Sequence, residues 1–351
     1  MIQTSGILSR VIAGPCSAEN RDQVLGTAGA LKEIGIEWFR AGLWKPRTRP
    51  DSFEGVGEKG IPWMKEVKSL LGLSICTEVA SSRHVELCLE AGFDMVWMGA
   101  RTTANPFLVD EIASALAGSD IKVFVKNPVN PDKNLWVGAV ERLGKHGVND
   151  VSVIHRGFST YKKMRYRNAP CWDMAIEFRT SFPEIPFYCD PSHMGGDASY
   201  VGEIAQKAMD LGLDGLMIES HINPSSALSD AGQQITPSRL GIMLDGLKVR
   251  NTDSEDAGYR ERLSLLRERI DDLDESILDL LSERMKVSRE IGSEKKSGNV
   301  AIIQPDRWDE VMDSIRKKSA SVGLDVDFAT RIFNEIHEAS VAEQNNIISK
   351  S

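Results

Sequence analysis

Short runs of apolar residues alternate with longer amphipathic stretches along the first 250 positions. The stretches carry apolar residues at helical spacing, for example at 22–34, 82–91, 107–116 and 200–211. The runs are typical of buried strands, and there are eight of them, at 10–14, 36–41, 73–77, 93–98, 121–126, 150–154, 185–189 and 214–218. Eight strand–helix units predict an α/β fold, the (β/α)8 TIM barrel. A doubly wound parallel sheet is the alternative.

The pattern changes near residue 258. Residues 1–258 hold 26 of the 29 glycines and 13 of the 14 prolines. The segment 248–258, KVRNTDSEDAG, is polar and has no apolar periodicity, which is typical of a linker. We therefore expect a barrel at 1–247, a linker at 248–258 and an all-α helical domain at 259–351.

The C-terminal part begins with a long amphipathic pattern. Residues 260–296 contain no proline, and apolar residues recur at 263, 266, 270, 273, 277, 280, 287 and 291. A helix of this length spans roughly 55 Å at the usual rise per residue. The rest of the domain is too short to cover it, so we expect a homodimer through the helical domain. A plain dimerisation coil is the alternative.

Charged and polar residues on these helices argue against a plain coil. Arg284 lies on the apolar stripe, where a cation is costly unless an anion meets it. Lys295 returns to the same face eleven positions later. Ser340 and Gln344 share a face of the last helix. Together they predict a polar site among the helices.

Composition excludes several classes of partner. The net charge is −9, which disfavours nucleic acid and an anionic membrane surface. No apolar run reaches the ~18 residues of a membrane-spanning helix, and the start of the chain has no secretion-signal pattern. Five cysteines at irregular spacing are typical of reduced thiols, so we expect a cytoplasmic protein.

Residues that can carry chemistry follow every predicted strand. The ends of barrel strands meet at one mouth, where barrel enzymes place their active sites. Six cations would converge there, and phosphate or carboxylate groups are their natural partners. Surface ion pairs are the alternative for any single one. The six are Arg40, Lys45, Arg47, Arg101, Lys126 and Arg156.

A metal site is the second possibility at this mouth. A thiolate, an imidazole and two carboxylates suit one divalent ion such as Mn, Fe, Co or Zn. The candidates are Cys16, His193, Glu219 and Asp230, which lie on four loops with no short spacing motif to unite them.

Several motifs resemble the 3-deoxy-D-arabino-heptulosonate 7-phosphate (DAHP) synthase family. They are AGPCSAEN (13–20), KPRTRPDSFEGVG (45–57), TEV (77–79), GARTT (99–103), VKNP (125–128), HRGF (155–158), DPSHMGG (190–196) and IESHINPSSALSDAGQQ (218–234). The resemblance implies a metal-dependent, aldol-like condensation of phosphoenolpyruvate with erythrose 4-phosphate that releases phosphate. It places the metal on the four candidates above.

The resemblance also assigns the substrates. It places phosphoenolpyruvate on Arg40, Lys45, Arg101, Lys126 and Arg156, and the aldehyde on Lys45, Arg47 and Thr48. Lys45 counts among the catalytic residues, and Glu78 is a candidate for managing the water that adds. A sister synthase that uses arabinose 5-phosphate shares much of this pattern. The KPRT segment at 45–48 favours the four-carbon aldehyde.

The helical part resembles the all-helical chorismate mutase family. The similarity lies in LRERIDDLDESILDLLSERMKVSREIG (266–292), Asp306-Arg307 and Ser340-x-x-x-Gln344. It implies rearrangement of chorismate to prephenate, with Lys295 and Gln344 stabilising charge on the ether oxygen. The implied site residues are Arg267 from the partner subunit, Arg284, Lys295, Arg307, Ser340 and Gln344. Trp308 stands where the family has a Glu, and Gln304 is its candidate substitute.

Three functions are compatible with these resemblances. The chain is a bifunctional enzyme, a synthase whose degenerate mutase domain acts only as a sensor, or a synthase with a dimerisation arm. The first strand begins near residue 10, which leaves no room before it for a regulatory domain. We therefore expect the helical domain to bind prephenate or chorismate and to mediate feedback inhibition of the barrel.

Overall fold

The structure, a computed structural model, describes residues 5–46, 52–161, 164–250 and 257–349. The chain divides into two compact units, Met1–Thr252 and Asp253–Ser351. Each unit has its own secondary structure and is described by itself below.

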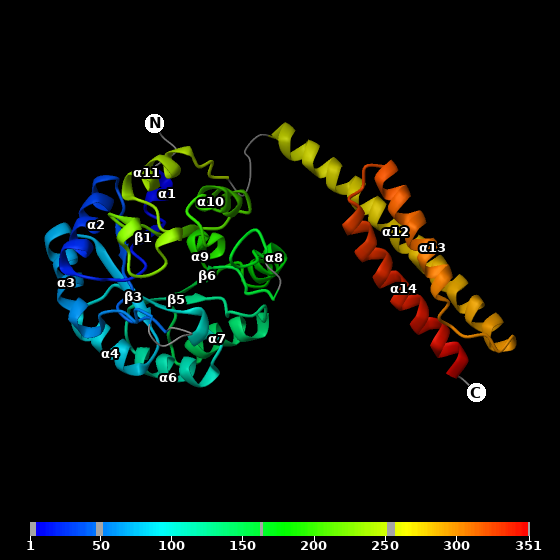
Figure 1. Cartoon of the computed structure of the whole chain (residues 1–351), viewed down its shortest axis with the longest axis horizontal. Coiled ribbons are helices and arrows are strands. Elements are labelled where there is room, and N and C mark those ends of the chain that lie inside the picture. Colours follow the sequence, from blue (N-terminus) through cyan, green and yellow to red (C-terminus); the bar gives the residue numbers. More distant parts are fainter. Residues whose placement is uncertain (1–4, 47–51, 162–163, 251–256, 350–351) are drawn as a thin grey trace. The chain divides into compact units, whose positions relative to one another are not determined.

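The first unit is a closed barrel of eight parallel strands (Figure 1). Each strand pairs with the next, and β8 closes the barrel on β1, with Ile12 opposite Met217. The predicted barrel is confirmed, and the alternative of a doubly wound sheet was wrong. The strands are β1 (Val11–Gly14), β2 (Trp38–Arg40), β3 (Ser74–Val79), β4 (Met95–Met98), β5 (Lys122–Lys126), β6 (Val151–His155), β7 (Phe187–Cys189) and β8 (Gly215–Glu219).

Helices surround the barrel. Most of them lie between consecutive strands, as the amphipathic stretches predict. They are α2 (Arg21–Glu33), α3 (Ile61–Leu71), α4 (Ser82–Ala91), α6 (Pro106–Leu116), α7 (Lys133–Lys145), α8 (Trp172–Ser181), α10 (Val201–Asp210) and α11 (Pro237–Gly246). Shorter helices are α1 (Ser5–Leu8), α5 (Ala100–Thr103) and α9 (Pro191–Gly195), with 3-10 turns η1 (Gly57–Gly60), η2 (Pro224–Ser226) and η3 (Ala231–Gln233).

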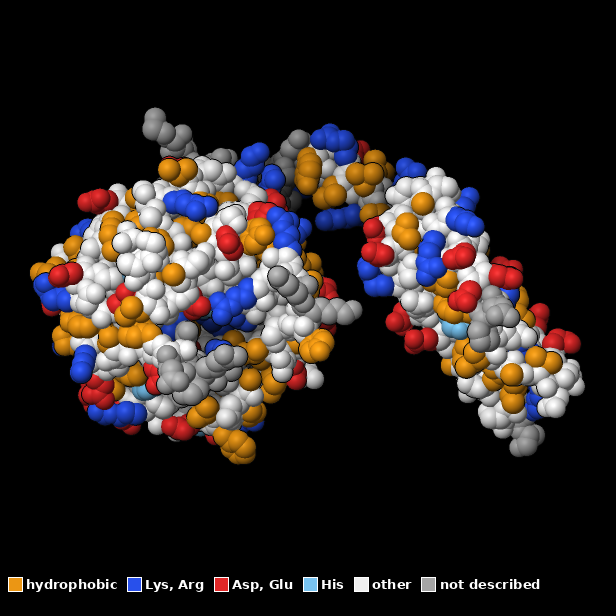
Figure 2. All heavy atoms as spheres, in the orientation of Figure 1, with side chains coloured by type: hydrophobic (Ala, Val, Ile, Leu, Met, Phe, Trp, Pro, Cys, Tyr) orange, Lys and Arg blue, Asp and Glu red, His pale blue; other side chains and the backbone are white. Residues whose placement is uncertain are grey.

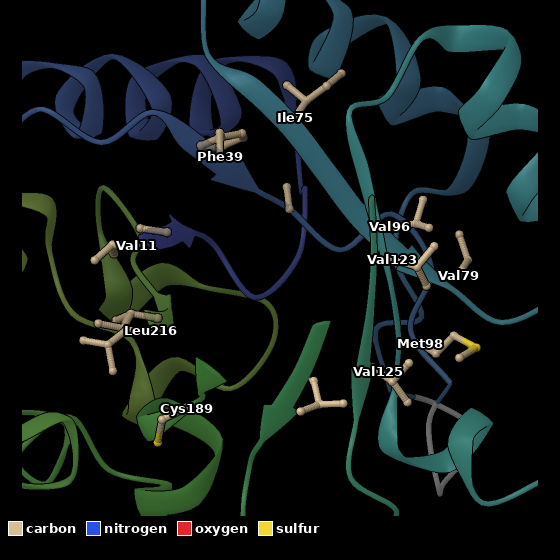
Figure 3. Close-up of a cluster of buried hydrophobic side chains, with 14 of the residues drawn as sticks. Val11, Phe39, Ile75, Val79, Val96, Met98, Val123, Val125, Cys189 and Leu216 are labelled. Atoms are coloured by element: carbon tan, nitrogen blue, oxygen red, sulfur yellow. The ribbon is translucent and has the colours of Figure 1, made fainter. Parts of the chain in front are cut away.

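Alternation along the strands divides the core into two layers. Outward side chains such as Phe39, Ile75 and Val123 pack in a large cluster between strands and helices (Figure 3). Inward apolar side chains form a second, smaller cluster inside the barrel, made of Ile12, Cys76, Met95, Trp97, Phe124, Ile154 and Met217. Because these residues fill the interior, the barrel is a solid support and its chemistry lies at the mouth.

The second unit consists of three helices: α12 (Ala257–Ser297), α13 (Pro305–Ser321) and α14 (Val326–Ser349). α14 packs against both α12 and α13. The amphipathic pattern thus correctly predicts one long first helix. Many apolar residues of α12 are exposed in the isolated chain, among them Leu266, Ile270, Leu273, Ile277 and Leu280. In the described part of the chain, no helix has the length and apolar character needed to cross a bilayer.

Candidate active sites

Trp97 separates the apolar barrel interior from the polar mouth. Its ring is fully buried, with the Arg40 guanidinium 4.8 Å and the Lys126 ammonium 5.8 Å from the ring centroid. Both cations therefore gain cation–π attraction where water is scarce. The indole N–H donates to Glu78 Oε2 at 3.3 Å. Trp97 thus holds two cations and one carboxylate at the floor of the site.

A cavity of about 320 Å³ opens above this floor. Blue side chains are visible in the hollow at the barrel mouth in Figure 2. The cavity is lined by residues at or after the ends of seven of the eight strands, β2 to β8, so these strand ends share one mouth. It is lined by Lys45, Pro46, Ser52, Glu78, Gly99, Ala100, Arg101, Lys126, Arg156, Arg167, His193 and Asp230.

Two of the cations form buried ion pairs. Lys126 Nζ lies 2.6 Å from Asp190 Oδ2, and Arg40 Nη2 lies 3.2 Å from Glu219 Oε1. Among the described residues, nothing hydrogen-bonds Arg40 Nε or Nη1, although both atoms are buried. Unpaired buried donors are costly, so these two nitrogens point to a ligand with acceptor oxygens.

Arg156 is held by a neutral partner. Its Nη1 donates to Asn168 Oδ1 at 2.9 Å. Burial, together with nearby Arg167 and Arg101, lowers the pKa of Arg156 to about 10, against the opposing effect of Asp190. The mouth therefore carries an excess of positive charge that an anion would relieve.

The acids of the site are ionised despite burial. Burial alone raises the pKa of Glu219, but His193, Arg40 and Lys45 together bring it below its usual value. Burial lowers the pKa of His193 below its usual value, against the opposing effect of Asp190. Neutral imidazole and ionised carboxylates are the forms that bind metal ions.

The four metal candidates form two pairs, from the loop after β1, from α9, from the end of β8 and from the loop that follows β8. Cys16 Sγ lies 3.2 Å from Asp230 Oδ2, and His193 Nε2 lies 3.5 Å from Glu219 Oε1. The Lys45 ammonium contacts the Cys16 sulfur and lies 3.0 Å from Asp230 Oδ2. A cation thus already occupies the space beside these donors.

The chemistry of this donor set fits a borderline divalent ion. Among the described residues, however, no three Cys, His, Asp or Glu side chains form a ready-made metal-binding group. Burial and the Glu219 carboxylate raise the pKa of Cys16 more than Lys45 lowers it, so its sulfur is protonated here. Lys45 supplies the positive charge that the carboxylates require.

Local backbone geometry brings these loops together. Gly14 ends β1 with φ +151°, and a Cβ there would lie 1.9 Å from the Arg40 carbonyl oxygen. Only glycine therefore lets β1 approach β2 closely enough to place Cys16. On the opposite side, Asp190 caps α9 by accepting from the His193 backbone N–H, and its Oδ2 lies 2.7 Å from His193 Nδ1.

Sequence reasoning missed two neighbouring residues of this site. Arg167 Nη1 donates to Asp230 Oδ1 and to Gln233 Oε1, each at 3.0 Å. Asn168 is buried, and its Nδ2 donates to the His193 carbonyl at 2.6 Å while its Oδ1 accepts from Arg156. No predicted strand ends directly before these residues, since the preceding one ends at residue 154. The cluster of basic residues at 162–167 was the only available signal.

The structure places the remaining barrel candidates as follows. Arg101 is exposed at the rim of the cavity and Glu78 lies within it. Arg47 and Thr48, the predicted aldehyde contacts, lie outside the described residues.

A second polar cluster lies in the helical unit. Arg284 Nη1 donates to Ser340 Oγ and, at 3.5 Å, to the Ile336 carbonyl. Lys295 Nζ donates to the Ile302 carbonyl at 2.6 Å. Gln344 is buried, and its Oε1 has no hydrogen-bond partner among the described residues. The two cations are suited to negatively charged groups of a ligand. The unused amide oxygen is suited to a hydrogen-bond donor of the same ligand.

Three predicted mutase residues do not join this cluster within one chain. Arg267 and Gln304 are exposed, and Arg307 pairs with Glu310 of its own helix at 3.0 Å. Trp308, where the resemblance expects a Glu, stacks on His337 with ring centroids 3.8 Å apart.

Comparison with known families follows the division into two units. Residues 4–251 match the model of the DAHP synthetase I family. The chain belongs to that family. Residues 266–345 match the model described as chorismate mutase type II, so the helical unit carries a domain of this kind.

Individual relatives agree with the family. A phospho-2-dehydro-3-deoxyheptonate aldolase of Thermotoga maritima is 31% identical over 226 residues, which cover 64% of this chain and 64% of that protein. A solved structure of DAHP synthase from Thermotoga maritima superposes with a TM-score of 0.61 at 28% identity, covering 69% of this chain and 72% of that one. A 2-dehydro-3-deoxyphosphooctonate aldolase of Azoarcus sp. is 29% identical, covering 68% of this chain and 89% of that protein.

Proposed function

We propose that this chain is a bifunctional enzyme of aromatic biosynthesis. The barrel condenses phosphoenolpyruvate with erythrose 4-phosphate to DAHP and phosphate. The helical unit rearranges chorismate to prephenate. The observation that carries the proposal is a cavity lined by Lys126 and Arg156, with Arg40 buried against Trp97 below it, in a chain that matches both families.

The buried cations determine how phosphoenolpyruvate binds. The two unpaired nitrogens of Arg40 are suited to a carboxylate or phosphate, which guanidinium groups bind through two donors. Lys126 and Arg156 add charge at the same mouth. Two phosphorylated substrates repel each other, so fixed cations both neutralise and orient them. Glu78 accepts from the Trp97 N–H and lines the cavity, so its carboxylate would orient the added water.

A divalent metal completes the proposed barrel site. Bound by Cys16, His193, Glu219 and Asp230, an ion such as Mn, Fe, Co or Zn would polarise the aldehyde carbonyl as a Lewis acid. The present contact of Lys45 with two of these donors supports a pocket built for positive charge. The motif at 45–48, with Arg47 and Thr48, favours erythrose 4-phosphate over the five-carbon aldehyde.

In the helical unit, charge and position are sufficient for the rearrangement. Arg284 and Lys295 would hold the two carboxylates of chorismate in a compact conformer, with Ser340 beside Arg284. Lys295 and Gln344 would stabilise charge that develops on the ether oxygen. A homodimer would cover the exposed stripe of α12 and bring Arg267 of the partner subunit to this site.

Removing metal tests the proposal directly. A chelator should abolish condensation by the full chain and leave chorismate turnover unchanged, because the proposed metal donors all belong to the barrel. Cys16→Ala should likewise lose condensation alone, and readdition of metal should restore the chelated wild-type enzyme but not this variant. Metal-dependent condensation at a near-normal rate in Cys16→Ala would show that the ligand set is wrong.

A mutase domain that only senses ligand is the second candidate. The pairing of Arg307 with Glu310, away from Arg284, favours it. Chorismate disappearance in the presence of the full chain distinguishes the two: turnover supports the bifunctional enzyme, and binding without turnover supports the sensor.

Feedback inhibition is the regulatory part of the proposal. Prephenate or chorismate bound to the helical unit would inhibit condensation by favouring one arrangement of the two units, with a coupling of typically 1–3 kcal/mol. A chain ending at residue 250 should keep condensation and lose inhibition by prephenate. Persistent inhibition of the shortened chain would contradict this role.

A further inference from the structure

The helical unit contains an imidazole that neither the sequence analysis nor the family match assigns. His337 lies on α14, three residues before Ser340 and seven before Gln344. Helical periodicity places all three on one face, within about 60° of each other. The face also receives Arg284, which donates to the Ile336 carbonyl and to Ser340 Oγ. His337 is therefore next to the cationic cluster.

The His337 ring also packs against α13. His337 stacks on Trp308 of α13, with centroids 3.8 Å apart and planes 19° from parallel. The Trp308 backbone N–H donates to the Gln304 carbonyl, and Lys295 donates to the nearby Ile302 carbonyl. His337 thus packs against α13, and both Arg284 and Lys295 are close enough to act on the charge of its ring. Gln344 adds a buried, unpaired acceptor on the same face of α14, judged within the described residues.

The protonation state of the ring matters here. Burial lowers the pKa of His337, and Arg284 and Lys295 lower it further, against a smaller opposing effect of Glu338. A neutral imidazole carries one donor and one acceptor nitrogen, which are the two functions a hydroxyl group can satisfy. A carboxylate in this place would pair with Arg284 or Lys295 and compete with the ligand's own carboxylates. A neutral ring leaves both cations available.

We propose that His337, held flat by Trp308, hydrogen-bonds the hydroxyl group of the dicarboxylate substrate of the helical unit. This inference rests on the proposed mutase function and assigns a specificity residue to it. Trp308 then acts as a positioning residue that fixes the ring plane. His337 and Trp308 would thus bind the hydroxyl with a neutral group, in place of the Glu that the resemblance expects at position 308.

The test compares two substrates in the full chain: chorismate and its analogue without the ring hydroxyl. His337→Phe keeps a stacking ring but loses both nitrogens, and His337→Gln keeps a donor and an acceptor. Glu335→Gln, on the opposite face of α14, is the matched control. We expect His337→Phe to lower kcat/KM for chorismate at least about tenfold, the effect of one lost hydrogen bond. With the analogue, kcat/KM of every variant should stay within about twofold of wild type, because the analogue has no hydroxyl group for His337 to bind.

His337→Gln should recover most of the loss with chorismate, and it supplies a second reading if the Phe variant folds poorly. Equal losses with both substrates would show that His337 only supports the structure, and an unchanged rate with chorismate would show that it makes no contact. Either result overturns the inference while the proposed function stands. A wild-type chain that converts neither substrate would instead refute the mutase proposal, and this inference with it.

Discussion

At the scale of single residues, the barrel site depends on pairing that burial enforces. Two buried ion pairs join Lys126 to Asp190 and Arg40 to Glu219. Burying any one of these charges without its partner would be strongly unfavourable. Even so, two nitrogens of Arg40 are left without partners in the described structure. A site built this way holds its cations rigid before substrate arrives, which reduces the cost of ordering them during the reaction.

Asn168 is a neutral residue that helps to hold the cations of the site in place. Its amide connects the Arg156 guanidinium to the His193 backbone, so it joins the cationic side of the mouth to the proposed metal site. Asn168→Ala removes a hydrogen bond to a charged group, worth about 1.5–3 kcal/mol, and should lower kcat/KM for phosphoenolpyruvate roughly ten- to a hundredfold. Steady-state kinetics with each substrate varied in turn measure the effect.

Asn130→Ala is the matched control, because Asn130 is exposed and its side chain accepts a hydrogen bond from Ser159 Oγ, at 3.1 Å. It should leave both kinetic constants near wild type. If Asn168→Ala is equally active, with an unchanged melting temperature, the two sites are not joined through this amide.

At the scale of elements, the periodicity of the sequence predicts the barrel well. Each strand is a short apolar run whose alternate residues face the helices and the interior, and that pattern is visible in one dimension. The position of each strand end also predicts that Arg40, Lys126 and His193 meet, because parallel strands end at one mouth.

Contacts within the loops could not be predicted in this way. Lys45 reaches the side of Cys16 and Asp230, which are 214 residues apart in sequence. Arg167 and Asn168 are placed by backbone bonds to Gly195 and Met194, and such pairing between loops leaves no periodic signal. In the helical unit, the stacking of Trp308 on His337 could not be predicted either, because the two residues belong to different helices.

The exposed stripe of α12 gives a prediction at this scale. If a second copy covers it, Leu273→Asp should convert a dimer to a monomer, because a buried charge without a partner is strongly unfavourable. Chorismate turnover should fall with it, since Arg267 would no longer reach the partner subunit's site. Sedimentation velocity measures the mass, with the neighbouring exposed Asp274→Asn as control. A dimer that survives Leu273→Asp would show that this stripe is not the interface.

At the scale of the whole molecule, the chain joins two different ways of using cations. The barrel holds Lys126 and Arg40 deep above an aromatic floor, beside carboxylates suited to a metal ion. The helical unit holds Arg284 and Lys295 on packed helices with hydroxyl and carbonyl partners. Because each compact unit holds its own cluster of cations, the two reactions should depend on separate residues.

The most direct measurement of that claim is to assay both reactions on the same preparations of two variants of the full chain. Lys126→Gln should lower condensation at least about a hundredfold, and Arg284→Gln should do the same to chorismate rearrangement, as expected for loss of a charge that stabilises a transition state. Each variant should keep the other activity within about threefold of wild type, as expected for independent sites without shared residues. Loss of both activities in either variant, or full chorismate turnover by Arg284→Gln, would contradict the account of two separate active sites.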